Sequence, residues 1–165
     1  MKIIRRELTL MTTFHSKKPK KNITQSKPEL EYDTQVRVVN YLAERYPTLI
    51  VQGSLGGIRL PIGNAVKAKK MGNKKDFPDL TIAIPNKKYA GCYIELKREG
   101  TRLYKSNGQL VTNEHFHAQD KLHKSLRAVG YYAEFAVGYQ DAIQQIEQYL
   151  STADLLPIID HDVHR

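Results

Sequence analysis

Two groups of residues in this chain bring carboxylates and a lysine to the ends of neighbouring apolar segments. Pro78-Asp79 opens the first segment, and Glu95-Leu96-Lys97 closes the second. Two converging carboxylates suit Mg²⁺, a hard cation that prefers oxygen ligands and keeps several waters. Such a site could polarise a phosphodiester, while Lys97 orients the attacking water or stabilises developing negative charge. Spacing alone leaves open a strand-end cap at Asp79 and a solvent-facing ion pair between Glu95 and Lys97.

The segments that carry these residues are typical of strands. Residues 79–85 (DLTIAIP) and 91–97 (GCYIELK) are short and apolar, and the NKK between them predicts a turn. Side chains alternate between the two faces of a strand, so Glu95 and Lys97 share a face and the apolar residues beside them take the other. If the strands form a hairpin, the start of the first lies beside the end of the second. We therefore expect the side chains of Asp79 and Glu95 to converge.

The rest of the chain alternates between helical and strand-like patterns. Helices are expected at residues 31–46 (apolar Tyr32, Val36, Val39, Leu42, Ala43 and Tyr46, ended by Pro47), in the basic residues 65–72, along Ala118, Leu122, Leu126 and Val129 up to Gly130, and along Ile143, Ile146, Tyr149 and Leu150. Residues 48–52 and 131–138 predict strands, and the glycine-rich residues 53–64 predict a loop. This order predicts an α/β (α+β) fold, a sheet with helices on its faces.

The charge balance points to a polyanionic partner. The chain has 26 Lys and Arg against 17 Asp and Glu, a formal net charge of +9. A basic field attracts phosphate backbones without specifying what happens there. Six of the basic residues lie together shortly before Asp79 with no acid among them and are candidates for phosphate contact, the alternative being a solvated basic helix: Arg59, Lys67, Lys69, Lys70, Lys74 and Lys75.

The chain reads as one domain with two tails. Residues 29–150 hold the periodic segments, residues 1–28 form a basic arm expected to be flexible, and residues 151–165 form a tail. Met11 is an alternative start to Met1. One cysteine excludes an internal disulfide and favours a reducing, cytoplasmic location. No apolar run approaches the roughly 20 residues needed to cross a bilayer, so no membrane association is expected.

Several long segments resemble a known family. GGIRLPIGNAVKAKKMG, FPDL, GCYIELKREG and AQDKLHKSLRAVGYYAEFAVGYQDAIQQIEQYL resemble, in that order, the VRR-NUC family of PD-(D/E)XK nucleases, of the standalone phage and bacterial type. The resemblance runs over about residues 31–150. It implies a restriction-endonuclease-like core, a mixed central sheet flanked by helices. The sequence departs from the family pattern at Asp76-Phe77, where a glycine is usual, and in residues 101–117, which are longer than the common connection.

The resemblance assigns roles to individual residues. It implies metal ligation by Asp79, Glu95 and the backbone carbonyl of Leu96, with Lys97 as the active-site lysine. It adds an acidic residue on the first helix, Glu31, as a further catalytic and metal-binding residue; an acid favouring the helix dipole is the alternative, and Glu29 is a nearby competitor. Gln35, one turn after Glu31, and the helical Gln119 complete the implied site: Asp79, Glu95, Lys97, Glu31, Gln119 and Gln35.

The function implied is that of a Mg²⁺-dependent deoxyribonuclease, with Mn²⁺ as a substitute. The resemblance points to DNA, duplex or branched, with Holliday-junction cleavage and DNA repair as the context, a bacterial or phage-infected cell as the location, and a homodimer as the assembly. The rival interpretation is a basic nucleic-acid-binding module without chemistry, or a nuclease without structure specificity. His115 and His117 alternate like a metal pair, but the chain offers them no cysteine partner nearby, so zinc is disfavoured.

Overall fold

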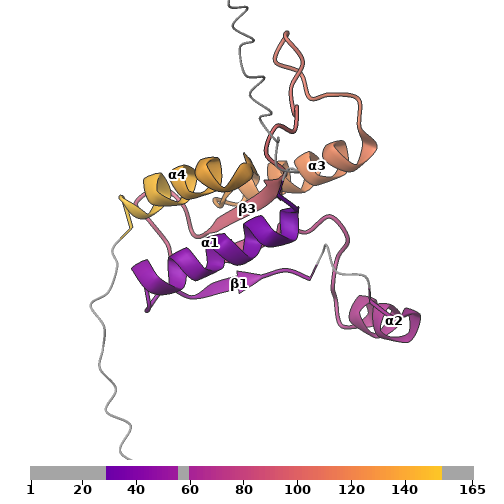
Figure 1. Cartoon of the computed structure of the whole chain (residues 1–165), viewed down its shortest axis with the longest axis horizontal. Helices are drawn as coiled ribbons and strands as arrows, with labels where there is room; N and C mark the ends of the chain where they lie inside the picture. Colours follow the sequence, from indigo (N-terminus) through magenta and orange to yellow (C-terminus); the bar gives the residue numbers. More distant parts are fainter. Residues whose placement is uncertain (1–28, 56–59, 154–165) are drawn as a thin grey trace, which may run out of the picture.

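The computed structural model describes residues 29–55 and 60–153. Four helices and a four-stranded sheet make up this part of the chain (Figure 1). The elements follow the order α1 (Glu31–Arg45), β1 (Val51–Gly53), α2 (Ile62–Lys70), β2 (Leu80–Ile82), β3 (Cys92–Lys97), α3 (Glu114–Ala128), β4 (Tyr132–Val137) and α4 (Gly138–Leu150).

The sheet is mixed and follows the order β1-β2-β3-β4. The first three strands pair antiparallel, and β3 pairs parallel with β4. A parallel pair requires a crossover connection, and α3 supplies it between β3 and β4. The expected α/β fold with a mixed, helix-flanked sheet is confirmed. The expected hairpin is also confirmed, because β2 and β3 are adjacent and antiparallel.

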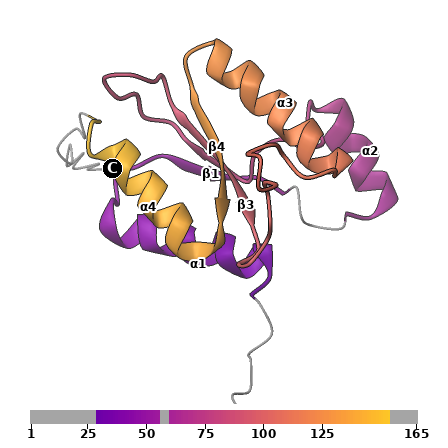
Figure 2. The ribbon, with the colours of Figure 1, turned by 90° about the horizontal axis from the view of Figure 1, so that it is seen from above.

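Helices cover both faces of the sheet. Helices α1 and α4 pack together on one face, and α3 lies against β4 on the other (Figure 2). The α1/α4 face holds the main core, where each buried aliphatic side chain contributes roughly 1.5–3 kcal/mol. Residues with no exposed surface in this core are Val38, Leu42, Leu80, Ile82, Cys92, Ile94, Leu96, Ala136, Ala142 and Ile146.

Helix α1 forms as expected but buries a different stripe. Val38 and Leu42 are fully buried, whereas Tyr32 and Val36 are exposed. Threonine at position 34 completes the buried face, which a purely apolar pattern misses. Packing against α4 and the sheet, rather than the residue types alone, decides which side of this helix is covered.

The strands before the site are shorter than their apolar runs. β1 spans only Val51–Gly53 and β2 only Leu80–Ile82, where residues 48–52 and 79–85 were expected. The β2–β3 turn is stabilised by Asn86, whose side-chain oxygen accepts hydrogen bonds from the backbone N–H groups of Lys88 (2.9 Å) and Tyr89 (2.7 Å). The turn predicted at NKK, residues 86–88, is therefore confirmed.

Helix α2 starts earlier than expected and stands away from the sheet. It begins at Ile62, inside the predicted loop, and ends at Lys70, after which Gly72 adopts a left-handed φ of 91°. None of its residues is buried, and Figure 1 shows it outside the layers formed by the other helices. Its lysines are therefore available to a partner.

Helix α3 carries a polar buried face. Asn113 caps it by accepting hydrogen bonds from the backbone N–H groups of His115 (3.0 Å) and Phe116 (3.2 Å). Its buried residues are Gln119 and His123, whereas Ala118 and Val129 of the expected stripe are exposed. The predicted stripe was therefore partly wrong. The reason is that the sheet face beneath α3 carries charged side chains, which polar rather than apolar residues of the helix cover.

Candidate active site

The two charged residues of β3 are buried. Glu95 and Lys97 are each only 3% exposed, on the sheet face that α3 covers, while Ile94 and Leu96 insert into the core on the opposite face. Burial of these apolar neighbours fixes the direction of the charged side chains. The alternative of a solvent-facing ion pair is wrong: the pair exists, with Lys97 Nζ 2.7 Å from Glu95 Oε1, but it lies inside the protein.

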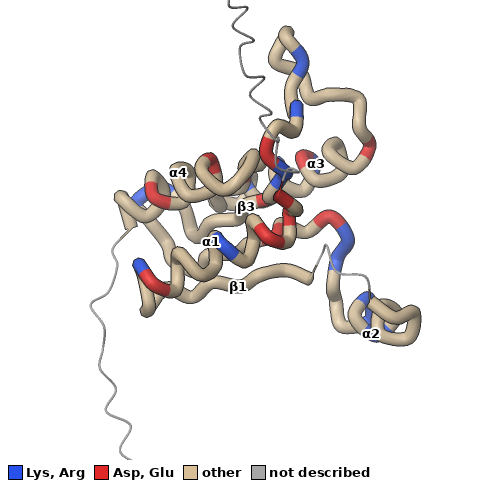
Figure 3. The backbone as a smooth tube through the Cα atoms, viewed as in Figure 1, with Lys and Arg blue, Asp and Glu red and all other residues tan. Residues whose placement is uncertain are grey.

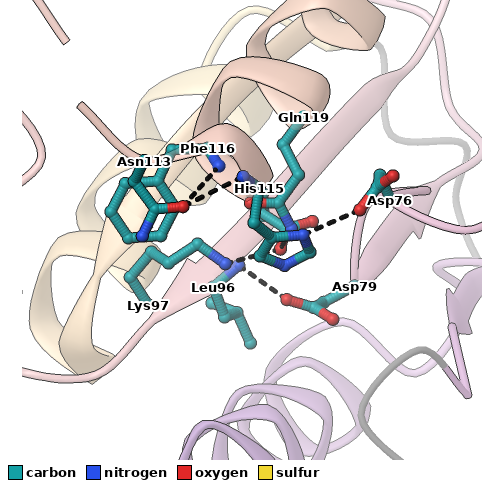
Figure 4. Close-up of polar contacts among 9 residues, drawn as sticks. Asp76, Asp79, Leu96, Lys97, Asn113, His115, Phe116 and Gln119 are labelled. Atoms are coloured by element: carbon teal, nitrogen blue, oxygen red, sulfur yellow. Dashed lines mark hydrogen bonds and ion pairs between the residues drawn. The ribbon is translucent and has the colours of Figure 1, made fainter. Parts of the chain in front are cut away.

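Asp79 lies beside this pair, as the hairpin predicts. Leu80 pairs with Ile94 in the β2–β3 register, so Asp79 comes next to the end of β3 that carries Glu95. Asp79 Oδ2 accepts a hydrogen bond of 2.9 Å from the backbone N–H of Leu96 (Figure 4). The contact shown for Leu96 is thus made by its N–H, while metal ligation by its carbonyl stays a prediction. This hydrogen bond to the main chain of β3 is one that a strand-end cap also makes, so the capping role of Asp79 stays open beside the metal-binding one.

Gln119 reaches Glu95 from α3. Its Nε2 donates a short hydrogen bond to Glu95 Oε1, the same oxygen that pairs with Lys97. Lys97 Nζ also lies 5.6 Å from the ring centroid of Phe116 and 5.9 Å from that of Phe135, which shield it from water. The second oxygen of Glu95, Oε2, is buried and has no hydrogen-bond partner among the described residues. One carboxylate oxygen is held and the other is left for a ligand.

Burial and mutual repulsion dominate the electrostatics of the two carboxylates. Loss of hydration raises the pKa of Glu95 to about 8, the nearby Asp79 charge adds to the rise, and Lys97 opposes it. Burial also raises the pKa of Asp79, against the lowering effects of the Leu96 N–H and the Lys97 charge. A cation placed between the two carboxylates would relieve both the repulsion and the missing hydration.

Gln35 supports the site through the backbone. Its Nε2 donates to the carbonyl oxygens of Asp79 (3.1 Å) and Ser54 (3.2 Å). The amide nitrogen approaches Gly53 so closely that a Cβ at that position would lie 3.0 Å from it, so a larger residue there would press on the Gln35 amide. The structure places Gln35 against the main chain of the site, where it positions Asp79 rather than lining the cleft.

A cleft of about 1020 Å³ opens over these groups. Lys69, Lys74 and Lys75 line it from α2 and the segment that follows. Figure 3 shows basic positions in the segment that leads from α2 toward the acidic positions near the start of α1 and β3. The cleft is lined by Glu31, Asp79, Glu95, Lys97 and Gln119, and by the three lysines.

Of the remaining predicted site residues, some line the cleft and others do not. Glu31 lines the cleft at the first residue of α1, whereas Glu29 forms an ion pair of 2.7 Å with Arg37, so Glu31 is the acid near the site. Lys67 and Lys70 belong to α2 but are not among the described residues that line the cleft. Arg59 lies outside the described residues.

Two lining residues were not predicted from the sequence as a pair. His115 Nδ1 lies 2.8 Å from Asp76 Oδ1 at the edge of the cleft. Asp76 has a left-handed φ of 65°, a conformation that favours glycine and that aspartate tolerates better than most residues. His117 is exposed on another side of α3, so the two histidines do not form a metal pair.

Another buried group was missed. His123 has no exposed surface, and neither of its ring nitrogens has a hydrogen-bond partner among the described residues. Its ring centroid lies 4.6 Å from that of Phe135, under the Glu95–Lys97 pair. Burial, with the Arg127 charge adding to it, lowers its pKa to about 4. His123 was not found from the sequence because the buried face of its helix, α3, was predicted from apolar residues alone.

The donor set fits an ion that brings water with it. Within residues 29–55 and 60–153, no group of three or more His, Cys, Asp or Glu side chains is arranged to hold a metal ion. Two carboxylates with an unpartnered buried oxygen at Glu95 do fit Mg²⁺, which is commonly bound by one or two carboxylates together with waters and substrate phosphates.

Among the described helices, none is long and apolar enough to cross a membrane.

Comparison with solved structures relates this chain to a nuclease-type domain. No protein-family model matches the chain, and no curated protein does. A solved structure described as a VRR_NUC domain protein matches with a TM-score of 0.54 and 28% sequence identity, covering 78% of this chain and 94% of that chain. The shared fold, the identity and the extent of the match agree with the resemblance of the individual segments. The chain is therefore related to the VRR-NUC family.

Proposed function

We propose that this protein is a Mg²⁺-dependent nuclease that hydrolyses phosphodiester bonds in DNA. The observation that carries the proposal is the single cleft in which Asp79, Glu95 and Lys97 meet beneath three lysines. The relationship to a VRR_NUC domain protein supports a nuclease-type domain. Carboxylates for a cation, a lysine for developing charge and basic residues for phosphate are the components that this reaction needs.

Asp79 and Glu95 are the residues that would hold Mg²⁺, with Glu31 at the cleft and the Leu96 carbonyl as further proposed ligands. When bound, the cation polarises the phosphoryl oxygen and lowers the pKa of a water. Mn²⁺, which favours the same ligands, is expected to substitute.

The chain's own side chains perform the other tasks. Gln119 holds one oxygen of Glu95 and leaves the other, which is buried and has no partner among the described residues, for the cation. Lys97, held by Glu95, supplies positive charge beside the reacting phosphate, where a water-poor site makes that charge more effective. Lys69, Lys74 and Lys75 bind the phosphates on either side.

Branched DNA, including the four-way junction, is the proposed substrate class, and a homodimer is the proposed assembly. Both extend the family resemblance. A two-fold dimer would present two clefts to a branched substrate, which makes paired incisions geometrically reasonable.

The test compares DNA structures and metals directly. Four-way junctions, flaps, linear duplex and single strands are incubated with the protein in Mg²⁺, Mn²⁺ or EDTA. Glu95→Ala and Lys97→Ala serve as site variants. Glu44→Ala and Lys88→Ala, exposed residues outside the cleft, serve as charge-matched controls.

We expect metal-dependent cleavage that is retained in both controls and reduced by about 10³-fold in the two site variants. Preference for the junction over linear duplex would support the branched substrate class. Salt-sensitive binding without cleavage in either metal would contradict the nuclease and favour a binding module. Cleavage undiminished in Glu95→Ala would contradict the assignment of the site.

A further inference from the structure

The lining of the cleft includes a histidine and an aspartate in contact, and the aspartate follows directly after two of the lysines. His115 lies in the first turn of α3, where the Asn113 cap fixes the backbone by accepting the His115 N–H at 3.0 Å. Its imidazole lines the cleft, and its side chain is 51% exposed. Nδ1 lies 2.8 Å from the buried Oδ1 of Asp76 (Figure 4), a close approach of the two side chains without the alignment of a hydrogen bond. Two elements distant in the sequence are thus joined at the site.

Asp76 is held in an unusual conformation to make this contact. Its φ of 65° is left-handed, which aspartate and asparagine tolerate better than most residues. Its side chain is only 18% exposed. Asp76 belongs to the short segment between α2 and β2 that also contains Asp79. Backbone strain of this kind persists where the surrounding structure enforces it and is frequent at functional sites.

The contact determines how the imidazole can be used. A carboxylate beside Nδ1 orients the ring and favours a proton on Nδ1. Nε2 is then the nitrogen left for the cleft. Among the described residues that line the cleft, His115 is the only histidine. The other charged side chains around the cleft are Glu31, Asp79, Glu95, Lys97, Lys69, Lys74 and Lys75.

Hydrolysis of a phosphodiester is accelerated by a proton donor placed at the leaving oxygen. The leaving alkoxide takes up a proton as the phosphorus–oxygen bond breaks, and general acids contribute about 10²–10⁴-fold to such steps. Lys97 is already engaged with Glu95 at 2.7 Å. Histidine is the side chain most often used as a general acid or base in proteins.

We propose that His115, oriented by Asp76, is the general acid that protonates the leaving oxygen. The inference rests on the proposed nuclease function. As the water oxygen forms its bond to phosphorus and releases a proton to solvent, the bond from phosphorus to the bridging oxygen breaks. The electron pair of that bond stays on the bridging oxygen, which takes the proton from Nε2 of His115. The imidazole regains a proton from solvent after the product leaves.

A leaving group that needs no proton tests this role. Once the wild-type cleavage position is mapped, the bridging oxygen that leaves is replaced by sulfur, whose thiolate departs without general-acid help. Wild type, His115→Gln and His117→Gln are compared on both substrates under single-turnover conditions in Mn²⁺. His117 is the matched control, two residues along the same helix and outside this cleft.

We expect His115→Gln to slow cleavage of the oxygen substrate by about 10²–10³-fold and of the sulfur substrate by less than about tenfold. His117→Gln should match wild type on both. Equal slowing of both substrates by His115→Gln, or no slowing of either, would overturn the general-acid role. Failure of the wild-type protein to cut any DNA would instead overturn the proposed function.

Asp76 is a positioning residue in this scheme, and its test has a readout besides activity. Asp76→Asn keeps a residue that tolerates positive φ and removes the charge. In ¹⁵N spectra of the imidazole, wild type should show the proton of neutral His115 on Nδ1, and Asp76→Asn should show a larger share on Nε2. In the His115→Gln background, Asp76→Asn should reduce cleavage no further. Unchanged spectra, or fully additive losses, would overturn the pairing.

Discussion

The two faces of β3 differ in chemistry, although their residues alternate along one strand. Ile94 and Leu96 are fully buried in an apolar core beneath α1 and α4. Glu95 and Lys97 are almost equally buried under α3, but as a charged pair with an unpartnered oxygen. The apolar face stabilises the fold and fixes the strand. The polar face opposes folding in exchange for a preorganised cluster of charges, as buried ion pairs commonly do.

Removing one partner of the buried pair should give the largest effect on stability. Glu95→Leu leaves the Lys97 charge buried without a partner and is expected to lower the free energy of unfolding by about 3–5 kcal/mol. The double variant Glu95→Leu/Lys97→Met should recover wild-type stability or exceed it by about 1–4 kcal/mol, while losing all metal-dependent cleavage. Urea unfolding measures both. A double variant less stable than Glu95→Leu would contradict the view that this face opposes folding.

On the apolar face, shortening a side chain should destabilise without any such rescue. Ile94→Ala creates a cavity in the core and is expected to lower the free energy of unfolding by about 2–5 kcal/mol. Val36→Ala, on the exposed side of α1, is the control and should change it by about 0.5 kcal/mol or less. Urea unfolding of the two variants measures this difference. Equal losses in both would mean that the core is not where the structure places it.

His123 extends the polar face and predicts a dependence of stability on pH. Its folded pKa of about 4 lies below the ordinary value of 6.5, so its protonation opposes folding. The stability present above pH 6.5 should fall as the pH drops toward 4, by at most about 3 kcal/mol. His123→Leu should remove this loss.

Glu95 also makes stability depend on pH, in the opposite direction, so the effect of His123 must be taken from the difference between two curves of stability against pH. Its raised pKa stabilises the metal-free fold below its ordinary pKa of 4.5, and this contribution is lost as the pH rises through about 8. Subtracting the curve of His123→Leu from that of wild type cancels this opposing trend. A flat difference between pH 4 and 6.5 would contradict the assignment to His123.

The smallest effects are expected at the lysines of the cleft. Lys69→Ala, Lys74→Ala and Lys75→Ala should each weaken DNA binding a few-fold and reduce the slope of log affinity against log salt by about 1. Lys87→Ala, at the β2–β3 turn away from the open end of the hairpin, should leave the slope unchanged. Fluorescence anisotropy in EDTA at several salt concentrations measures the slopes. An equal change in Lys87→Ala would mean that the DNA does not lie over the cleft.

Local rules were enough to predict the centre of the site. Strand alternation placed Glu95 and Lys97 on one face, and the hairpin brought Asp79 beside Glu95, as the structure confirms. Both rules act over a few residues and one turn. The same locality explains why the basic character of residues 62–75 was visible, whereas the selection of Lys69, Lys74 and Lys75 over Lys67 was not.

The features that could not be predicted from the sequence depend on packing between elements far apart in the chain. The buried face of α3 is polar because it covers Glu95 and Lys97. The apolar stripe therefore predicted that a helix forms here, but not that Gln119 and His123 are its buried residues. The contact between His115 and Asp76 joins residues 39 positions apart through the placement of that helix.

Metal binding by the protein without DNA tests the central claim most directly. Free Mn²⁺ is measured by electron paramagnetic resonance during titration of wild type, Glu95→Gln and the control Glu44→Gln at pH 6.5 and 8.5. Because the cation must displace a proton from Glu95, whose pKa is about 8, wild-type affinity should rise roughly tenfold or more between the two pH values. Glu95→Gln should bind much more weakly at both, and Glu44→Gln should match wild type. Equal Mn²⁺ binding by wild type and Glu95→Gln would contradict a metal site at Asp79 and Glu95.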